Sequence, residues 1–214
     1  EQERRMLAVY ALLAENGHQL QHLHFMNSAA TVYRPNPRCT LARVGIILYG
    51  LLPNYPVPVP LPLKPVMTLK SVISHIKEAE AGDCISYGRT YTTPEDKLVA
   101  VLPIGYVSHP CRIATVTIGY ADGYSRLLSN KAYAIVHGVA CPIVGRVCMD
   151  QLMLDISELK DPVKPGDEVT MFGTEGNVTI TPDELAAFYG TIGYEIVCGI
   201  SKRVPRVVVN GNIE

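Results

Sequence analysis

The sequence predicts a short α/β segment followed by a larger, mostly β domain. Residues 1–55 alternate helical and strand patterns, whereas residues 56–214 hold many short apolar stretches separated by glycine or proline. Between them, residues 53–65 carry six of the sixteen prolines, which remove backbone donors and favour extended chain. We therefore place a domain boundary near Tyr55, with domains at residues 1–55 and 56–214.

The first segment predicts the order helix, strand, helix, strand. Apolar residues at helical spacing predict a helix over residues 4–16, which Gly17 ends. Residues 20–26 and 41–49 predict two buried strands. Between them, Asn27-Ser28 is typical of a helix N-cap.

The second segment predicts a β barrel or sandwich, because short strands alternate with turn signals. The expected strands lie at residues 66–76, 97–104, 112–118, 132–137, 140–148, 152–156, 167–172 and 177–180. One helix interrupts them. Thr181-Pro182-Asp183-Glu184 combines an N-cap, a proline at the first helical position and a capping-box glutamate, and Gly190 ends the helix.

Composition and charge argue against several classes of function. The net charge of −1 gives no basic surface for nucleic acid. Apolar runs stay shorter than the ~18–20 residues of a membrane helix, and residues 1–5 do not resemble a signal peptide. The six cysteines show no zinc or C-x-x-C spacing, so we expect reduced thiols in a cytoplasmic protein. His22 and His24 could share a strand face, but no acidic or thiol partner lies nearby, and we expect no metal.

The chain contains an internal repeat that bears on the fold. The string VLPIGY at residues 101–106 recurs fourteen residues later as TVTIGY at residues 115–120. This pattern fits two similar strands, or an insertion of about fourteen residues around 100–113. An insertion could shift the strand register, and a slip of one residue turns every side chain to the opposite face.

Polar residues in glycine-bounded turns are the candidates for chemistry, because loops at strand ends commonly carry functional sites. These turns are Tyr120-Ala121-Asp122-Gly123 and Arg146-Val147-Cys148-Met149-Asp150. The sequence has no phosphate-loop motif and no G-x-S-x-G nucleophile motif. The pattern alone therefore predicts a site without naming its reaction.

Several strings together resemble the alanine racemases, a family that uses pyridoxal phosphate (PLP). Its C-terminal domain is similar to ISYGRTY (85–91), IGYADGYSRLL (118–128), VGRVCMDQLMLD (144–155), TIGYE (191–195) and ISKRVPRV (200–207). The last strands of its PLP-binding barrel are similar to HFMNSAA (24–30) and LARVGIILYG (41–50). The resemblance implies a mostly β, alanine-racemase C-terminal-like barrel, preceded by the last strands and helices of a (β/α)8 barrel.

The resemblance also implies an activity, the interconversion of L- and D-alanine that supplies D-alanine to peptidoglycan. PLP serves as the electron sink, and two opposed bases, a lysine and a tyrosine, move the α-proton. The family is dimeric, and the tyrosine of one subunit reaches the cofactor of its partner. Tyr120 matches that tyrosine, and Tyr106 in the first copy of the repeat is the alternative. The alternative is that Tyr120 has no catalytic role and is a tyrosine packed at the end of a strand.

Other positions match residues that bind the cofactor or the substrate. Arg43 matches the arginine that faces the pyridine nitrogen of PLP, and His24 matches the histidine that supports this arginine. The matches to residues that contact the PLP phosphate are Ser28, Gly45, Ile46 and Tyr194. Arg43 would donate a hydrogen bond without giving up a proton, because guanidinium stays charged. The backbone N–H of Met149 would meet the substrate carboxylate, and Arg146, Asp150 and Ile192 would line the access channel. The alternatives are a core histidine for His24, a helix cap for Ser28 and a surface ion pair for Arg146 and Asp150.

The family's cofactor-binding lysine has no counterpart here. Residues 1–63 contain no lysine, and no string resembles the V-K-A-N-A-Y-G that carries it. Residues 1–55 would supply about two strands of a barrel that closes only with all of them. We therefore expect a fragment or truncated gene product, inactive alone. The alternatives are a serine racemase relative, a chain that only dimerises or binds, and an unrelated β-barrel binding module.

Overall fold

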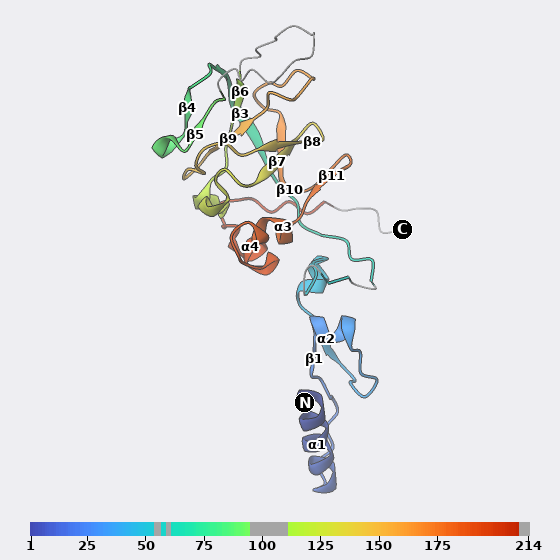
Figure 1. The fold of residues 1–214 in the computed structure, drawn as a ribbon. Coiled ribbons are helices and arrows are strands. Elements are labelled where there is room, and N and C mark those ends of the chain that lie inside the picture. The colour runs from blue at the N-terminus through green and yellow to red at the C-terminus, as the bar shows by residue number, and fades with distance from the viewer. Residues whose placement is uncertain (54–56, 59–60, 95–110, 210–214) are drawn as a thin grey trace, which may run out of the picture. The chain divides into compact units, whose positions relative to one another are not determined.

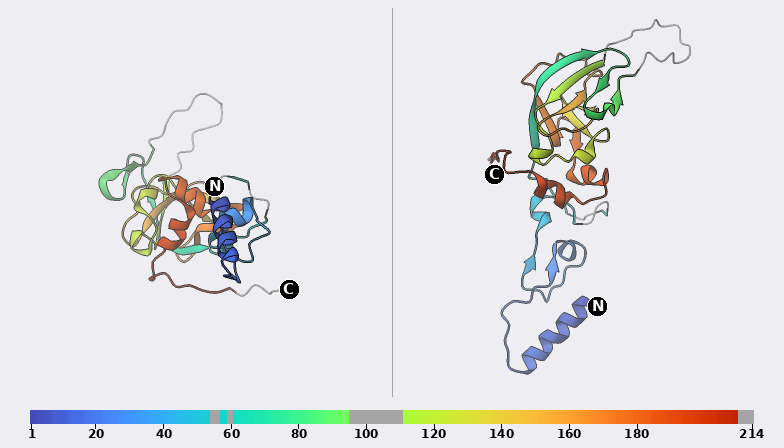
Figure 2. Two further views of the ribbon diagram at one scale, coloured as in Figure 1. Left: turned by 90° about the horizontal axis from the view of Figure 1, so that it is seen from below. Right: turned by 90° about the vertical axis from the view of Figure 1, so that its left-hand side faces the viewer.

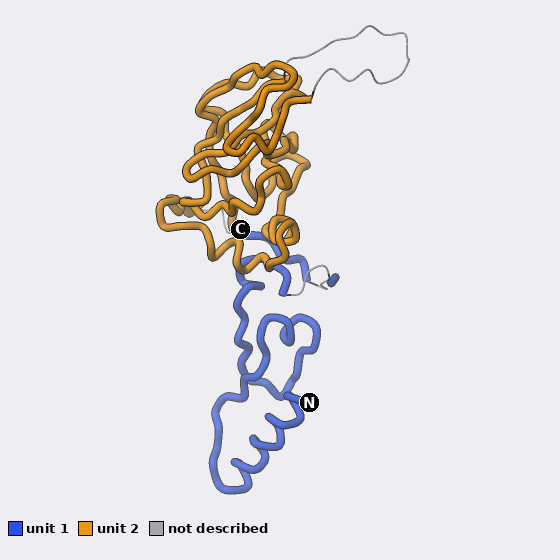
Figure 3. The backbone as a smooth tube through the Cα atoms, turned by 60° about the vertical axis from the view of Figure 1, so that its left-hand side comes forward, with its two compact units in different colours: residues 1–66 blue, residues 67–214 orange. Residues whose placement is uncertain are grey.

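The computed structural model describes residues 1–53, 57–58, 61–94 and 111–209, which form two compact units (Figure 3). The first unit spans Glu1–Val66 and the second Met67–Glu214. Tyr55, where the sequence places the boundary, lies outside the described residues. Across the described residues, no helix combines the length and the apolar character needed to cross a bilayer.

The first unit contains the predicted helices but shorter strands than expected. Its elements are α1 (Gln2–Glu15), β1 (Met26–Asn27), α2 (Ser28–Tyr33), β2 (Ala42–Arg43) and the 3₁₀ helix η1 (Ile46–Tyr49). The side chain of Asn27 caps α2 by accepting a hydrogen bond from the N–H of Ala30 at 2.9 Å, which confirms the predicted cap. β1 and β2 pair in parallel, with Asn27 opposite Arg43.

The prediction of a strand throughout residues 41–49 is wrong beyond Arg43. Gly45 opens the 3₁₀ turn η1, and Gly50 closes it in the left-handed region at φ 73°. The prediction at residues 20–26 is likewise too long, because β1 begins only at Met26. Short apolar runs fit a buried strand and a buried turn equally well, so periodicity cannot separate them.

The second unit is built mostly from short strands, as the sequence predicts, but the strand expected at 140–148 already ends at Pro142 and β3 is eleven residues long. Its strands are β3 (Leu69–Ala79), β4 (Cys84–Ile85), β5 (Tyr91–Thr92), β6 (Cys111–Val116), β7 (Tyr133–Val136), β8 (Val139–Pro142), β9 (Leu152–Asp155), β10 (Glu168–Glu175) and β11 (Val178–Ile180). Its helices are η2 (Tyr87–Arg89), η3 (Tyr120–Asp122), η4 (Arg126–Leu128), α3 (Pro182–Ala187) and α4 (Gly193–Gly199). Thr181 and Glu184 form the predicted capping box of α3.

The described sheet of the second unit closes on itself. Its strands follow the order β8-β7-β10-β3-β6-β9 through antiparallel pairs, and β11 pairs with β10 (Figure 1). Ile143, just after β8, forms a bridge with Leu154 of β9, so the two ends of this path meet. The result is a barrel with α3 and α4 together at one end (Figure 2). This closure confirms the predicted β barrel.

The second copy of the repeat supplies the end of β6 and the turn that follows it. Val116 and Ile118 of this copy are buried in the core, as are Ile113 and Ala114 just before it. The N–H of Thr117 donates to the carbonyl of Val72 at 3.2 Å. The first copy has proline at the equivalent position 103, which lacks the N–H for this bond. The pattern therefore favours the second copy for this place in the sheet; Tyr106 and the strand expected at 97–104 lie outside the described residues.

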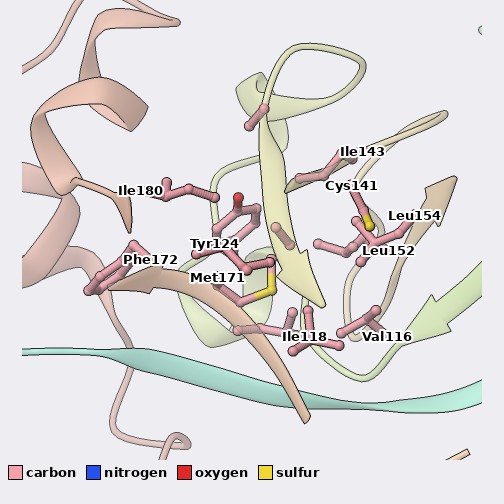
Figure 4. Close-up of a cluster of buried hydrophobic side chains, with 14 of the residues drawn as sticks. Val116, Ile118, Tyr124, Cys141, Ile143, Leu152, Leu154, Met171, Phe172 and Ile180 are labelled. Atoms are coloured by element: carbon pink, nitrogen blue, oxygen red, sulfur yellow. The ribbon is translucent and has the colours of Figure 1, made fainter. Parts of the chain in front are cut away.

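The barrel core is mostly apolar, and the buried hydroxyl of Thr170 in β10 donates to Oε2 of Glu175 at 2.8 Å. Met171, Phe172, Leu152 and Leu154 are fully buried, and Tyr124 lies among them with 2% of its surface exposed (Figure 4). Among the described residues, the Tyr124 hydroxyl is the buried side-chain polar atom that lacks a hydrogen-bond partner. Burial raises the pKa of this phenol well above its usual value, so the group stays neutral.

Removing the Tyr124 hydroxyl should not weaken the fold. We expect Tyr124→Phe to leave the free energy of unfolding unchanged or raise it by about 1 kcal/mol, because a buried unpaired hydroxyl costs about 1–3 kcal/mol. Urea unfolding of both proteins measures the difference, with Tyr133→Phe at an exposed tyrosine as the matched control. A loss beyond about 1 kcal/mol for Tyr124→Phe would contradict the unpaired state of this hydroxyl.

Candidate active site

A cavity of about 590 Å³ opens in the second unit where three loops converge. These loops are the turn η2, the segment η3–η4 and the connection from β8 to β9. The lining residues are Tyr87, Tyr120, Arg126, Arg146, Val147, Cys148, Met149, Asp150 and Gln151. The structure thus brings together the predicted site residues Tyr120, Arg146, Met149 and Asp150.

The turn that carries Tyr120 (the Tyr120 turn, residues 119–123) is hydrogen-bonded to the turn that carries Met149 (the Met149 turn, residues 146–150). The N–H groups of Tyr120 and Ala121 donate to the carbonyls of Cys148 and Met149, each at 3.0 Å. A Cβ at Gly119 would lie 2.2 Å from the Cys148 carbonyl oxygen, so this close approach requires glycine. Tyr120 itself is 44% exposed and lines the cavity, which contradicts the alternative of a packed strand-end tyrosine.

Arg203 joins these two turns from the C-terminal part of the chain. Its Nη2 donates to Oδ1 of Asp150 at 2.8 Å, and its Nε lies 3.5 Å from Oδ1 of Asp122. Oδ2 of Asp122 in turn accepts the N–H of Gly119 at 3.0 Å. Asp150 is therefore neutralised by Arg203, a residue that the sequence analysis did not single out. The guanidinium groups of Arg126 and Arg146 remain in the cavity lining, where positive charge suits a carboxylate.

Tyr87 is one of three cavity residues, with Arg126 and Gln151, to which the sequence alone assigned no role. Its side chain is 75% exposed and lies on the turn η2. The residue before it, Ser86, has φ 68° and ψ 179°, and Arg89 has φ 50°. Such conformations cost about 1–3 kcal/mol each and concentrate at functional sites. The signal was present in the string ISYGRTY, whose glycine marks a tight turn directly after the tyrosine.

Three predicted residues meet in the first unit. The N–H of Gly45 donates to Oγ of Ser28 at 2.9 Å, and Ile46 begins η1 directly afterwards. Ser28 and Gly45 follow the carboxyl ends of the parallel strands β1 and β2, which is where phosphate groups bind in (β/α)8 barrels. Asn27, not Ser28, caps α2, so the alternative of a simple cap is wrong for Ser28. A buried hydroxyl beside backbone N–H groups fits a phosphate.

The remaining predicted residues neither line the cavity nor take part in the Ser28–Gly45 hydrogen bond. Arg43 is exposed on β2, and His24 is exposed before β1. Ile192 and Tyr194 belong to the second unit, outside the cavity lining. Burial and then the Asp183 carboxylate raise the pKa of Tyr194 above its usual value. Its contact with a phosphate stays a prediction.

The described residues contain no group of three or more metal-ligating side chains. His22 and His24, the pair that could have shared a strand face, are both exposed and lie outside the strands. The six cysteines are free thiols.

Comparison with known proteins gives matches along most of the chain. The family model for the alanine racemase C-terminal domain matches residues 66–108 and 107–208, and that for the N-terminal domain matches residues 1–53. The alanine racemase of Geobacter sulfurreducens is 44% identical over 99% of this chain and 52% of its own length. That of Clostridium novyi is 43% identical over 95% of this chain and 50% of its own length.

The solved structures that are similar to this chain are also alanine racemases. The alanine racemase of Bacillus anthracis with bound L-Ala-P gives a TM-score of 0.83 at 37% identity, covering 100% of this chain and 52% of that one. The Clostridium difficile 630 enzyme in complex with cycloserine gives 0.80 at 41% identity, covering 95% of this chain and 49% of that one. The chain therefore spans about half the length of the relatives it matches.

Proposed function

Because this chain belongs to the alanine racemase family, we propose that it forms the C-terminal half of a PLP-dependent enzyme that interconverts L- and D-alanine. The observation that carries the proposal is the cavity of the second unit. Two phenols, two guanidinium groups and the Met149 turn line one space of about 590 Å³. This set can bind a small carboxylate and exchange a proton with its α-carbon.

PLP, when bound, supplies an electron sink at the α-carbon. In this chain Ser28, Gly45 and Ile46 would hold its phosphate through a hydroxyl and backbone N–H groups. Arg43 would face the ring nitrogen, where its permanently protonated guanidinium donates a hydrogen bond and keeps its own proton. We further propose that His24 supports Arg43 and that Tyr194 contacts the phosphate.

Racemisation requires a base on each face of the α-carbon, and a phenol can serve on one face. A phenol with an ordinary pKa near 10 needs nearby positive charge to act as a base, and Arg126 and Arg146 lie in the same cavity lining. Family resemblance favours Tyr120 for this role. The exposure of Tyr87 and its strained turn favour Tyr87. The Met149 N–H would hold the substrate carboxylate, while Arg146, Asp150 and Ile192 line the access channel.

We also propose that the working enzyme is a homodimer whose sites are shared between subunits. Tyr87 and Met149 are 75% and 53% exposed at the cavity, which suits contact with a second copy. In this arrangement the cavity of one subunit would face the cofactor held by its partner. The D-alanine product would serve peptidoglycan synthesis.

The test is to restore a complete enzyme. The chain, joined behind the N-terminal half of the Clostridium novyi alanine racemase and supplied with PLP, should interconvert L- and D-alanine, as measured by chiral chromatography. The chain alone, under the same conditions, should not. Turnover of serine in preference to alanine would indicate the serine racemase alternative. A joined protein that binds PLP and turns over neither amino acid would leave only the binding or dimerisation function.

Loss of the Ser28 hydroxyl should weaken cofactor binding. In the joined protein we expect Ser28→Ala to raise the Kd for PLP about tenfold or more, because a hydrogen bond to a charged phosphate contributes about 1.5–3 kcal/mol. Absorbance titration with PLP measures the change. Thr31→Ala is the matched control on the same helix, because its hydroxyl bonds to the carbonyl of Asn27. Equal Kd values for both variants and the unchanged protein would remove Ser28 from the phosphate site.

A further inference from the structure

One side chain outside the cavity lining joins two of the loops that form it. Nδ2 of Asn130 donates to the carbonyl oxygen and to Oγ1 of Thr90, both at 3.2 Å. Oδ1 of Asn130 accepts the N–H of Gly145. Thr90 directly follows the turn that carries Tyr87, and Gly145 directly precedes Arg146. The amide of Asn130 thus connects the Tyr87 turn with the segment that leads to Met149.

The segment 145–147 depends on such side chains, because it lies outside the strands. Backbone groups that lack strand partners must be satisfied otherwise. Besides the bond to Asn130, the N–H of Val147 donates to Oγ of Ser129 at 3.0 Å. The carbonyl of Arg146 accepts from Oγ of Ser86 at 2.9 Å. Three short side chains from two other loops therefore fix this part of the cavity wall.

Tyr87 has little packing of its own, since its side chain is 75% exposed. Its place is set by hydrogen bonds on either side of its turn. Ser86, before the turn, bonds to Arg146, and Thr90, after the turn, bonds to Asn130. Only Asn and Gln carry a donor and an acceptor on one side-chain amide. Asn130 also has φ 55°, a left-handed conformation that asparagine tolerates better than most residues. Both properties point to a requirement for asparagine here.

We propose that Asn130 is a positioning residue that sets the place of the Tyr87 phenol relative to Arg146 and Met149. Its relevance to catalysis rests on the proposed racemase function, whereas its effect on the Tyr87 turn does not. Losing the amide should release the turn while the barrel stays intact, because Asn130 is exposed and lies outside the core cluster.

The direct test is ¹⁹F NMR of the 214-residue chain labelled with 3-fluorotyrosine. The Tyr87 resonance is assigned by its loss in Tyr87→Phe, and the core Tyr124 resonance by its loss in Tyr124→Phe. Asn130→Gly removes all three side-chain hydrogen bonds of Asn130 and keeps the left-handed backbone free of strain. Asn130→Asp keeps the acceptor for Gly145 and loses the donors to Thr90. His137→Gly is the matched control, a second left-handed residue, in the turn from β7 to β8.

We expect the Tyr87 resonance to move toward that of free fluorotyrosine in both Asn130 variants and to stay in place in His137→Gly. The Tyr124 resonance should stay unchanged in all three. An unmoved Tyr87 resonance in Asn130→Gly and Asn130→Asp would overturn the proposal. A shift of Tyr124 together with Tyr87 in both Asn130 variants would also overturn it, because Asn130 would then support the whole domain.

Kinetics of the joined racemase give the second readout. Asn130→Gly should lower kcat at least tenfold with KM changed less than about threefold, because misplacing a reacting group by about 1 Å can cost 10²-fold in rate. A loss confined to KM would contradict positioning of the phenol. If the Tyr87 resonance moves but the unmodified joined protein shows no racemisation, the racemase proposal fails while the link from Asn130 to Tyr87 stands.

Discussion

Replacing Tyr87 with phenylalanine in the joined racemase should slow racemisation by about 10²–10⁴-fold, the usual contribution of general acid–base catalysis. In the proposed mechanism the phenol serves one face of the α-carbon only. Exchange of the α-proton with solvent should therefore fall much further from one alanine enantiomer than from the other. Deuterium incorporation from D₂O, followed separately for L- and D-alanine by mass spectrometry, measures this asymmetry.

Tyr120→Phe is the matched variant, because both phenols line the same cavity. If Tyr120 is the base, as family resemblance suggests, the asymmetric loss follows Tyr120→Phe and Tyr87→Phe has the smaller effect. Tyr106→Phe tests the first copy of the repeat in the same way. Exchange that stays equal to the unmodified enzyme in all three variants would exclude a phenol from proton transfer.

Substituting alanine for Gly119 should lower the free energy of unfolding by about 3 kcal/mol, at the upper end for overpacking. The added Cβ would lie 2.2 Å from the Cys148 carbonyl oxygen and 2.4 Å from that of Met149, and neither backbone atom can rotate away. The Tyr120 and Met149 turns would have to separate. Urea unfolding measures the loss.

Gly199→Ala is the control for this substitution. A Cβ at Gly199 would meet its nearest neighbour, the Gly123 carbonyl oxygen, at 3.9 Å, an ordinary contact. We expect its unfolding free energy to change by less than about 0.5 kcal/mol. Equal losses for Gly119→Ala and Gly199→Ala would show that the close approach of the two turns does not contribute to stability.

Much of the fold could be predicted from local sequence patterns. The capping box at Thr181 and the N-cap at Asn27 depend on contacts within four residues, and both are confirmed. The alternation of short strands and turns predicted a barrel or a sandwich, and the bridge between Ile143 and Leu154 closes the sheet as a barrel. The ends of β1 and β2 could not be predicted, because an apolar run continues unchanged from a strand into the 3₁₀ turn η1.

The site was predictable only in part. Resemblance named Tyr120, Arg146, Met149 and Asp150, and the fold brings them into one cavity. Tyr87 and Arg203 lay in matched strings, but their importance depends on partners far away in the sequence. The Tyr87 turn is bonded to Arg146, about 60 residues away. Arg203 pairs with Asp122 and Asp150, about 50–80 residues away. Contacts of this kind arise from tertiary folding, and no periodicity in the sequence records them.

The two ion pairs that Arg203 forms with Asp122 and Asp150 limit how this region can evolve. Each carboxylate belongs to a different turn, and one guanidinium serves both. A lineage that loses the positive charge at 203 would leave the carboxylates of two hydrogen-bonded turns without their shared cation. Change at these three positions should therefore be inherited as a set, so that natural variants replace them together or keep all three.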